Sequence, residues 1–212
     1  MSTPENTSTS TPEQDDKAQR HVTRMQRKKA VIDEKVAAAQ EERGLVLINT
    51  GNGKGKSSAA FGVLARAVGH GLNAAVVQFV KSRTGTGEEA FFSQHPAIQW
   101  FVMGEGFTWE TQDPDRDRRA ARAAWEQACA CLRDEALGLV ILDEFTYALK
   151  YGWVDIEEVG EALHNRPRMQ HVILTGRAAR PELIELADTV TDMTLVKHAF
   201  QSGLKAMPGI EW

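Results

Sequence analysis

One short segment constrains the fold of this chain more than any other. Residues Thr50 to Ser58 read TGNGKGKSS; they follow the apolar run Leu45 to Asn49 and lead into a helix predicted from Lys56 to about His70. Glycines let the backbone curl so that successive N–H groups point inward, and the helix start adds its positive dipole end. A strand, a glycine loop closed by lysine and serine, and a helix form the pattern of a phosphate-binding loop.

Within this loop we expect Lys56 to neutralise phosphate oxygens and the Ser57 hydroxyl to reach a magnesium ion. The loop departs from the standard pattern at Thr50, where a glycine is usual. A glycine-rich turn without a ligand is the structural alternative, and the combination of strand, lysine, serine and helix argues against it. The predicted phosphate-binding residues are Gly51, Asn52, Gly53, Lys54, Gly55, Lys56, Ser57 and Ser58.

A second motif is the apolar run Leu139 to Leu142 followed by Asp143 and Glu144. An apolar strand that ends in acids places carboxylates at the carboxyl edge of a sheet, beside a phosphate loop. Asp143 or Glu144 could hold magnesium directly or through water, and Glu144 could instead orient water as in ATP-hydrolysing enzymes. An ordinary acidic helix cap is the alternative. The two motifs together predict a site for ATP or GTP.

Apolar runs alternate with helical patterns along the rest of the chain. We expect strands at 74–80, 98–103, 139–143, 171–175 and 189–196, and helices at 114–137, 156–163 and 181–187. Strands that are apolar throughout and separated by helices indicate a mostly parallel sheet with helices on both faces. The predicted fold is therefore α/β, P-loop NTPase-like (RecA-like), in one domain from 44 to 212.

The N-terminal region differs in composition. Residues 1–16 are polar and carry no aliphatic side chains after Met1, so we expect a disordered tail. Residues 17–43 are rich in helix formers, and an apolar stripe recurs at spacings of three and four. This periodicity predicts an amphipathic helix with one buried face, which either docks on its own domain or lies over a ligand site or a partner subunit.

Overall composition excludes several classes of protein. Hydrophobic residues make up 42% and charged residues 25% of the chain, as in an ordinary globular protein. No apolar run reaches the ~20 residues of a membrane helix, and a formal net charge of -4 argues against general nucleic-acid binding. Cys129 and Cys131 lie two apart in a predicted helix and point to different faces, so they cannot bridge each other. These features and the polar N-terminus predict a cytoplasmic protein.

Two further segments are candidates for contact with a ligand. Phe107 and Trp109 stand in a polar, glycine-flanked loop, where they either tuck back onto the domain or form an apolar platform for a flat ligand or a partner. The run Thr175-Gly176-Arg177 follows a predicted strand at the carboxyl edge of the sheet. It could contact a nucleotide, and a simple turn explains it equally well.

Together these motifs resemble those of the ATP:corrinoid adenosyltransferases, the cob(I)alamin adenosyltransferase family that has a P-loop. The resemblance runs from about Val31 to the C-terminus, and its most specific parts are Gly106–Thr111 and Val196–Phe200. Ser57 stands where the family commonly has threonine, and both residues carry the hydroxyl. The remaining matching segments are 51–57, 59–62, 66–71, 77–79, 142–144 and 174–177.

The resemblance implies transfer of the 5′-deoxyadenosyl group of ATP to the Co(I) centre of a corrinoid, cobalamin or cobyrinic acid a,c-diamide, with release of triphosphate. Co(I) is the nucleophile, so no protein nucleophile is needed. By the same carry-over, Lys56, the amides of Gly53 to Ser58 and a magnesium ion held by Ser57 and Glu144 stabilise the departing triphosphate. The resemblance further implies that ATP lies in the reverse orientation to that in ordinary P-loop enzymes.

The resemblance also assigns the other segments. Phe107 and Trp109 lie beneath the corrin ring, where they displace the lower axial ligand of cobalt and ease its reduction from Co(II). The helix at 17–43 covers the active site, the enzyme is a homodimer, and a reduced flavoprotein is a suitable electron donor.

Two alternatives remain open from the residues themselves. One is a RecA-like ATPase or nucleotide kinase, in which Glu144 activates water or an acceptor. The other is a nucleotide-dependent binding module, in which Phe107 and Trp109 form the partner patch. The products separate them: triphosphate indicates adenosyl transfer, ADP with phosphate indicates hydrolysis, and absence of turnover indicates a binding module.

Overall fold

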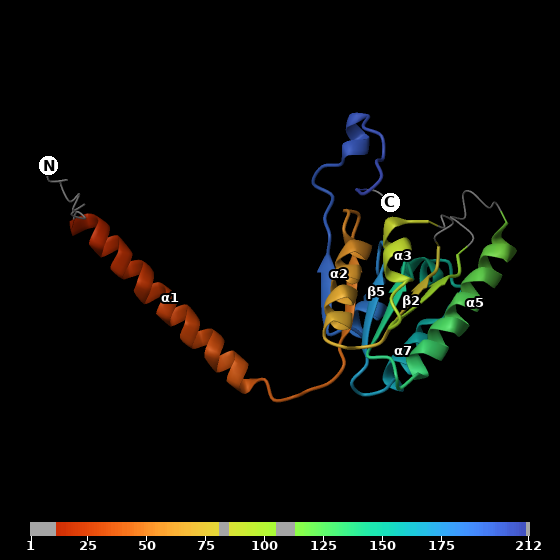
Figure 1. Cartoon of the computed structure of the whole chain (residues 1–212), viewed down its shortest axis with the longest axis horizontal. Coiled ribbons are helices and arrows are strands. Elements are labelled where there is room, and N and C mark those ends of the chain that lie inside the picture. Colours follow the sequence, from red (N-terminus) through yellow and green to blue (C-terminus); the bar gives the residue numbers. More distant parts are fainter. Residues whose placement is uncertain (1–11, 81–84, 105–112, 211–212) are drawn as a thin grey trace, which may run out of the picture. The chain divides into compact units, whose positions relative to one another are not determined.

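The computed structural model of the chain describes residues 12–80, 85–104 and 113–210 (Figure 1). The chain divides into two compact units, Met1–Glu42 and Arg43–Trp212. Among the described residues, no helix combines the length and the apolar character that crossing a membrane requires.

In the part of the first unit that the structure describes, residues 12–42, there is one helix, α1, which spans Pro12–Ala38. It begins and ends earlier than the predicted range 17–43, so residues 12–16 are helical where we expect a disordered tail. Proline suits a helix start because its φ is already fixed near the helical value and the missing N–H has no partner there anyway. The pair Lys29–Asp33, 2.5 Å apart, joins successive turns of the helix.

The second unit is built on a sheet whose neighbouring strands are all parallel. Within the described residues the sheet has six strands in the order β3-β2-β4-β5-β1-β6. The predicted parallel α/β architecture is confirmed. The strands are β1 Val46–Thr50, β2 Ala74–Gln78, β3 Ile98–Val102, β4 Leu139–Asp143, β5 His171–Thr175 and β6 Thr189–Asp192.

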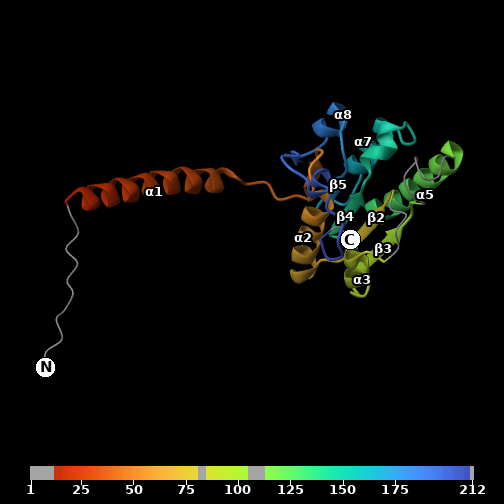
Figure 2. The same cartoon turned by 90° about the horizontal axis from the view of Figure 1, so that it is seen from above.

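Helices cover both faces of this sheet. Figure 2 shows α2 and α3 on one side of the strands and α5, α7 and α8 on the other. Their bounds are α2 Lys56–Gly69, α3 Gly87–Phe92, α5 Pro114–Arg133, α6 Thr146–Lys150, α7 Ile156–His164 and α8 Pro181–Glu185, with a 3₁₀ helix η1 at Ala199–Ser202.

The alternation of side chains along each strand divides the core in two. Val140 and Leu142 face the cluster formed with α5, α6, α7 and α8, whereas Leu139 and Ile141 face the smaller cluster formed with α2. All four side chains are at most 1% exposed. Because both faces are buried, the strands read as continuous apolar runs in the sequence.

Several element boundaries differ from the predictions, for local reasons. The helix predicted to reach Leu137 ends at Arg133, because Asp134 caps it and accepts a hydrogen bond from the amide of Ala136 (2.9 Å). The helix α3 was not predicted, although Thr86 accepts from the amide of Glu89 (3.3 Å) in a recognisable N-cap. The short helices α6 and η1 were also missed.

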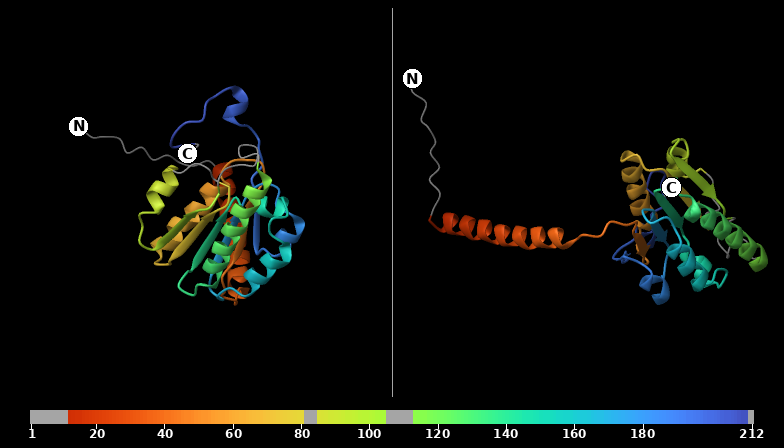
Figure 3. Two further views of the ribbon diagram at one scale, coloured as in Figure 1. Left: turned by 90° about the vertical axis from the view of Figure 1, so that its right-hand side faces the viewer. Right: turned by 90° about the horizontal axis from the view of Figure 1, so that it is seen from below.

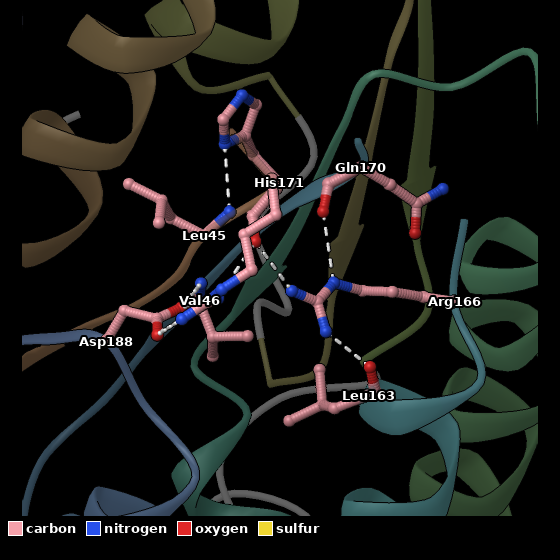
Figure 4. Close-up of polar contacts among 9 residues, drawn as sticks. Leu45, Val46, Leu163, Arg166, Gln170, His171 and Asp188 are labelled. Atoms are coloured by element: carbon pink, nitrogen blue, oxygen red, sulfur yellow. Dashed lines mark hydrogen bonds and ion pairs between the residues drawn. The ribbon is translucent and has the colours of Figure 1, made fainter. Parts of the chain in front are cut away.

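At the amino ends of β1 and β5, Arg166 holds three segments together (Figure 4). Its guanidinium lies among backbone carbonyls rather than carboxylates, and burial lowers its pKa. The three acceptors are the carbonyl oxygens of Gly44 (2.9 Å), Gln170 (3.0 Å) and Leu163.

A second contact at this edge joins β1 to the start of β6. Arg43 donates to both carboxylate oxygens of Asp188, one at 2.8 Å, and the amide of Val46 donates to the same carboxylate at 2.8 Å. The amide of Leu45 donates to Nδ1 of His171 at 3.1 Å. At the amino ends of β1, β5 and β6, these polar groups therefore bond to one another within the protein.

The chain continues past the opposite edge of the sheet. The segment from Met193 to Ile210 rises beyond the carboxyl ends of the strands, and the left view of Figure 3 shows it there in blue. Val196, Phe200 and Ile210 on this segment are 93%, 77% and 77% exposed.

Candidate functional site

The loop predicted to bind phosphate lies at the carboxyl edge of the sheet, between β1 and α2. Gly55 is the N-cap of α2 and has a φ of 109°, and Gly51 has a φ of 99°. A Cβ on Gly51 would lie 2.2 Å from Oδ1 of Asp192, so only glycine fits there. Asn49 Nδ2 donates to the carbonyl of Lys56 (3.1 Å), which ties the start of α2 to β1.

Lys56 is the central cation of this loop. It is 7% exposed, and its ammonium donates to the carbonyl oxygen of Gly53 at 2.7 Å. Burial lowers the pKa of Lys56; the negative charge of Glu144 opposes this shift, whereas the positive charges of Arg177 and Lys54 add to it. A bound polyphosphate would relieve both the desolvation and the repulsion.

Thr50, the residue that departs from the standard loop, has a structural role. Its side chain is buried, and Oγ1 accepts a hydrogen bond from the amide of Ala179 at 3.1 Å. Ala179 lies in the loop after β5, so Thr50 ties the start of the phosphate loop to its neighbouring loop. A glycine at position 50 would have no side chain with which to make this bond.

The segment after β6 supports the loop from the other side. The amide of Gly53 donates to the carbonyl of Met193 at 2.6 Å, and the amide of Met193 donates to the carbonyl of Thr50 at 2.8 Å. These bonds explain why β6 ends at Asp192 and not at the predicted Val196. They also show that the Gly53 amide, expected to contact phosphate, is bonded within the protein here.

The acids of the second motif lie at the end of β4. Asp143 is fully buried: Oδ1 accepts from the hydroxyl of Thr175 (2.8 Å) and Oδ2 accepts from the amide of Gln78 (2.9 Å). Trp100 Nε1 donates in turn to Oε1 of Gln78 at 3.2 Å. One hydrogen-bonded chain therefore runs across four neighbouring strands, from β3 to β5, and fixes the Asp143 carboxylate.

Glu144 has an unusual backbone conformation. Its φ is 58°, which is rare for a residue with a side chain, and such conformations persist where surrounding contacts determine them. Here the amide of Glu144 donates to Oγ1 of Thr175 (2.9 Å), and the fully buried Phe145 packs against Phe79 with ring centroids 5.1 Å apart. These contacts direct Glu144 out of the β4 strand path at the carboxyl edge.

The strand order brings the two motifs together. β5 alone separates β1 from β4, so the phosphate loop and Glu144 flank the end of β5 at the same edge. Glu144 acts on the pKa of Lys56, which agrees with this proximity. The sequence prediction of one site made from both motifs is thus matched by their positions.

Not every predicted site residue occupies the same environment. Gly53 and Lys56 are buried, Gly51, Gly55 and Ser57 are half-buried, and Asn52, Lys54 and Ser58 are exposed. Phe107 and Trp109 lie outside the described residues. Gln78 was missed as a site residue, although a polar residue at the end of an otherwise apolar strand is a recognisable signal. Thr175 was predicted either to contact a nucleotide or to form a simple turn, and its bonds to Asp143 and Glu144 were not predicted.

The donor set fits a hard divalent cation such as magnesium. Ser57 and Glu144 offer hydroxyl and carboxylate oxygens, which magnesium prefers. Asp143 already uses both carboxylate oxygens in hydrogen bonds, so its reach to a cation is better suited to an intervening water.

A parallel sheet, a glycine loop with a buried lysine and an acid two strands away define a P-loop α/β protein of the nucleotide-binding class. Residues 42–212 match the family model described as ATP:corrinoid adenosyltransferase BtuR/CobO/CobP, and residues 7–36 match a model of the cob(I)alamin adenosyltransferase N-terminus. The chain belongs to the ATP:corrinoid adenosyltransferase family and is an adenosyl-transferring enzyme.

Curated relatives agree with this assignment. A corrinoid adenosyltransferase of Pseudomonas aeruginosa is 56% identical over 94% of this chain and 99% of its own length. Corrinoid adenosyltransferases of Escherichia coli and Salmonella typhimurium are 46% and 47% identical, each over 92% of this chain and 98% of their own lengths. The resemblance inferred from the motifs is confirmed, and the ATPase, kinase and binding-module alternatives are not favoured.

Proposed function

We propose that this enzyme binds ATP by its triphosphate and presents the C5′ carbon to the Co(I) centre of a corrinoid, cobalamin or cobyrinic acid a,c-diamide. The electron pair of Co(I) forms the Co–C bond, and the C5′–O bond breaks with its pair going to the triphosphate. The observation that best supports this assignment is the buried Lys56 within a glycine loop that faces Glu144, in a chain of this family.

The protein has two tasks in this reaction. It positions C5′ in line with cobalt and the leaving oxygen, which is worth several kcal/mol as an order of magnitude. It also stabilises the charge that builds on the departing triphosphate. Lys56 and the amides of Gly55 to Ser58 perform the second task, because they are preorganised at the start of α2.

Magnesium, when bound by Ser57 and Glu144, would neutralise part of the triphosphate charge. Asp143 has a supporting role in this arrangement. Thr175 bonds both the Asp143 carboxylate and the Glu144 amide, so it holds the two acids in a fixed relation. Loss of the Thr175 hydroxyl is therefore expected to lower the affinity for magnesium rather than to abolish turnover.

Several parts of the proposal concern the corrinoid side. Phe107 and Trp109 form the apolar surface below the corrin ring and exclude the lower axial ligand, which eases reduction of Co(II). The N-terminal helix covers the active site, and the enzyme acts in the cytoplasm as a homodimer that receives electrons from a reduced flavoprotein. The exposed apolar side chains of α1, Val22, Met25, Ile32 and Val36, support a role in which that face becomes covered.

One assay tests the core of the proposal. Purified enzyme is incubated with ATP, magnesium and a chemically reduced Co(I) corrinoid; the absorbance spectrum reports the Co–C bond and phosphate analysis identifies the leaving group. We expect alkylated corrinoid and triphosphate in equal amounts. Release of ADP and phosphate without alkylation would contradict adenosyl transfer.

A second assay tests the aromatic loop. Phe107→Ala and Trp109→Ala are compared with wild type, once starting from Co(II) with a reductant and once from Co(I). We expect a loss of at least about tenfold from Co(II) and a much smaller loss from Co(I), because only the first reaction requires removal of the axial ligand. Equal losses in both reactions would mean that Phe107 and Trp109 contribute to binding of the corrinoid and not to removal of the axial ligand.

A further inference from the structure

Arg177 occupies the place in the fold between the two halves of the site. It lies in the loop after β5, the strand that separates the phosphate-loop strand β1 from the acid-bearing strand β4. Parallel strands all present their carboxyl ends at one edge, so this loop leaves the sheet between Lys56 and Glu144. The backbone of Arg177 therefore lies between the two motifs of the site.

Bonds from both neighbouring motifs fix this loop. Thr146, just after Glu144, donates its hydroxyl hydrogen to the carbonyl of Arg177 (2.8 Å). On the other side, the amide of Ala179 donates to Oγ1 of Thr50 (3.1 Å). The Arg177 backbone is therefore held on both sides by the motifs that surround the site, as preorganised binding requires.

Gly176 shows that this loop conformation is closely specified. Its φ is 142°, and a Cβ at this position would lie 2.0 Å from Oγ1 of Thr146. Ala178, on the other side of Arg177, has a φ of 51°. A non-glycine residue rarely adopts this conformation, and the strain is typical of functional loops.

The charge environment of Arg177 differs from that of Arg180 and Arg122. Arg180, three residues further on, pairs with Glu182 at 3.4 Å, and Arg122 pairs with Glu158 at 3.0 Å. Arg177 is exposed, and within the described part of the chain its guanidinium forms no ion pair. Its charge instead acts on Lys56, where it adds to the lowering of the lysine pKa. Like charges that gather in this way suit a polyanionic ligand.

We propose that Arg177 is a second phosphate-binding cation, which contacts the triphosphate of ATP and stabilises it as the leaving group. The inference rests on the proposed adenosyl transfer. As Co(I) forms its bond to C5′ and the C5′–O bond breaks, the departing oxygen gains one negative charge. A guanidinium, with its planar fork of donors, binds such oxygens bidentately and without proton transfer.

The test compares Arg177→Ala and Arg177→Lys with wild type and with Arg180→Ala, a matched control on the same loop. Turnover is measured with chemically reduced Co(I) corrinoid, and binding of inorganic triphosphate is measured by calorimetry. For Arg177→Ala we expect kcat/KM for ATP to fall about 100-fold and triphosphate affinity to fall at least about tenfold. Arg177→Lys should retain part of both, and added guanidinium ion should partly restore Arg177→Ala.

The outcomes are separable. If Arg177→Ala stays within about twofold of Arg180→Ala in both kcat/KM and triphosphate affinity, Arg177 does not bind phosphate and the inference is wrong. If wild type forms no Co–C bond, the proposed function fails, and the calorimetric comparison still decides whether Arg177 binds triphosphate. Thermal unfolding of the variants should match wild type, because the replaced side chain is exposed.

Discussion

The two edges of the sheet differ in how their positively charged side chains are paired. At the amino edge, Arg166 donates to three backbone carbonyls and Arg43 makes two bonds to Asp188, so the cations there have partners within the protein. At the carboxyl edge, Lys56 donates to a single backbone carbonyl, that of Gly53, and the positive charge of Arg177 adds to the lowering of the Lys56 pKa. The first edge stabilises the fold, and the second is arranged for a ligand that the fold itself does not supply.

Backbone conformation follows the same division. Among the described residues, the non-glycine residues with positive φ are Glu144 and Ala178, and both lie in loops at the carboxyl edge. Each such residue costs about 1 kcal/mol or more, and the cost is tolerated where neighbouring contacts fix the chain. This division indicates that substitutions at the amino edge change mainly stability, whereas substitutions at the carboxyl edge change mainly activity.

The largest effect is expected for Lys56→Ala. We expect kcat/KM for ATP to fall by about 10³-fold, because the variant lacks the buried cation that stabilises the leaving triphosphate. The melting temperature should stay the same or rise, since removal of a desolvated and repelled charge relieves unfavourable energy. Steady-state kinetics and thermal unfolding measure the two quantities.

The control for this prediction is Lys150→Ala, which removes an exposed lysine outside the phosphate loop. It should leave kcat/KM within about twofold of wild type. A Lys56→Ala protein that lost both activity and several degrees of melting temperature would remove the contrast between the two edges.

Arg166→Met is the counterpart at the amino edge. We expect the free energy of unfolding to fall by about 2–3 kcal/mol, because the carbonyls of Leu163 and Gln170 lose the Arg166 donor and that of Gly44 keeps only the longer bond from Arg43 (3.3 Å). Methionine keeps much of the side-chain volume, so packing is largely preserved. Urea denaturation measures the loss, and kcat/KM per folded molecule should be unchanged.

This prediction also has a contrary outcome. If Arg166→Met reduced kcat/KM per folded molecule by tenfold while the unfolding free energy was unaffected, the amino edge would have a functional role. The two edges would then be coupled through β1 and β5, and their separation would be wrong.

Thr50→Val tests the contact that joins the phosphate loop to the loop of Arg177. Valine has the shape of threonine without the hydroxyl, so the amide of Ala179 loses its acceptor. We expect kcat/KM to fall about 3- to 10-fold, because both loops become less well positioned. Thr50→Ser keeps the hydroxyl and should stay close to wild type; equal losses in both variants would assign the effect to packing.

Much of the fold was predictable because it follows from local rules. The strands at Leu139–Asp143 and His171–Thr175 are confirmed as predicted, since both are apolar runs buried on both faces. The N-cap at Asp113 is confirmed, because its carboxylate accepts from the amide of Arg116 at 3.0 Å. These features depend on neighbours in sequence.

The parts that sequence reasoning missed depend on contacts between distant segments. The Gln78 side chain belongs to the site only because β2 lies beside β4, and the early end of β6 depends on its bonds to the phosphate loop. The role of Thr50 likewise requires a loop far along the chain. The strand order creates these contacts, and local sequence patterns do not predict the strand order.

The smallest effect is expected for Asp188→Asn. The hydrogen bonds from Arg43 lower the pKa of Asp188 from 3.8 to about 2. A carboxyl whose pKa is lowered by folding contributes stability above its unfolded pKa, and the contribution is lost as the pH falls from about 4 to about 2. After allowance for solvent screening, the expected loss at neutral pH is about 1 kcal/mol.

Urea denaturation at pH 7 and near pH 3 should show the difference between wild type and variant shrinking at the lower pH. Glu182→Gln, which alters an exposed pair with Arg180, should leave the free energy of unfolding unchanged at both values. If the difference in the free energy of unfolding between wild type and Asp188→Asn did not change with pH, the stabilisation at the amino edge would come from packing and not from the charge of Asp188.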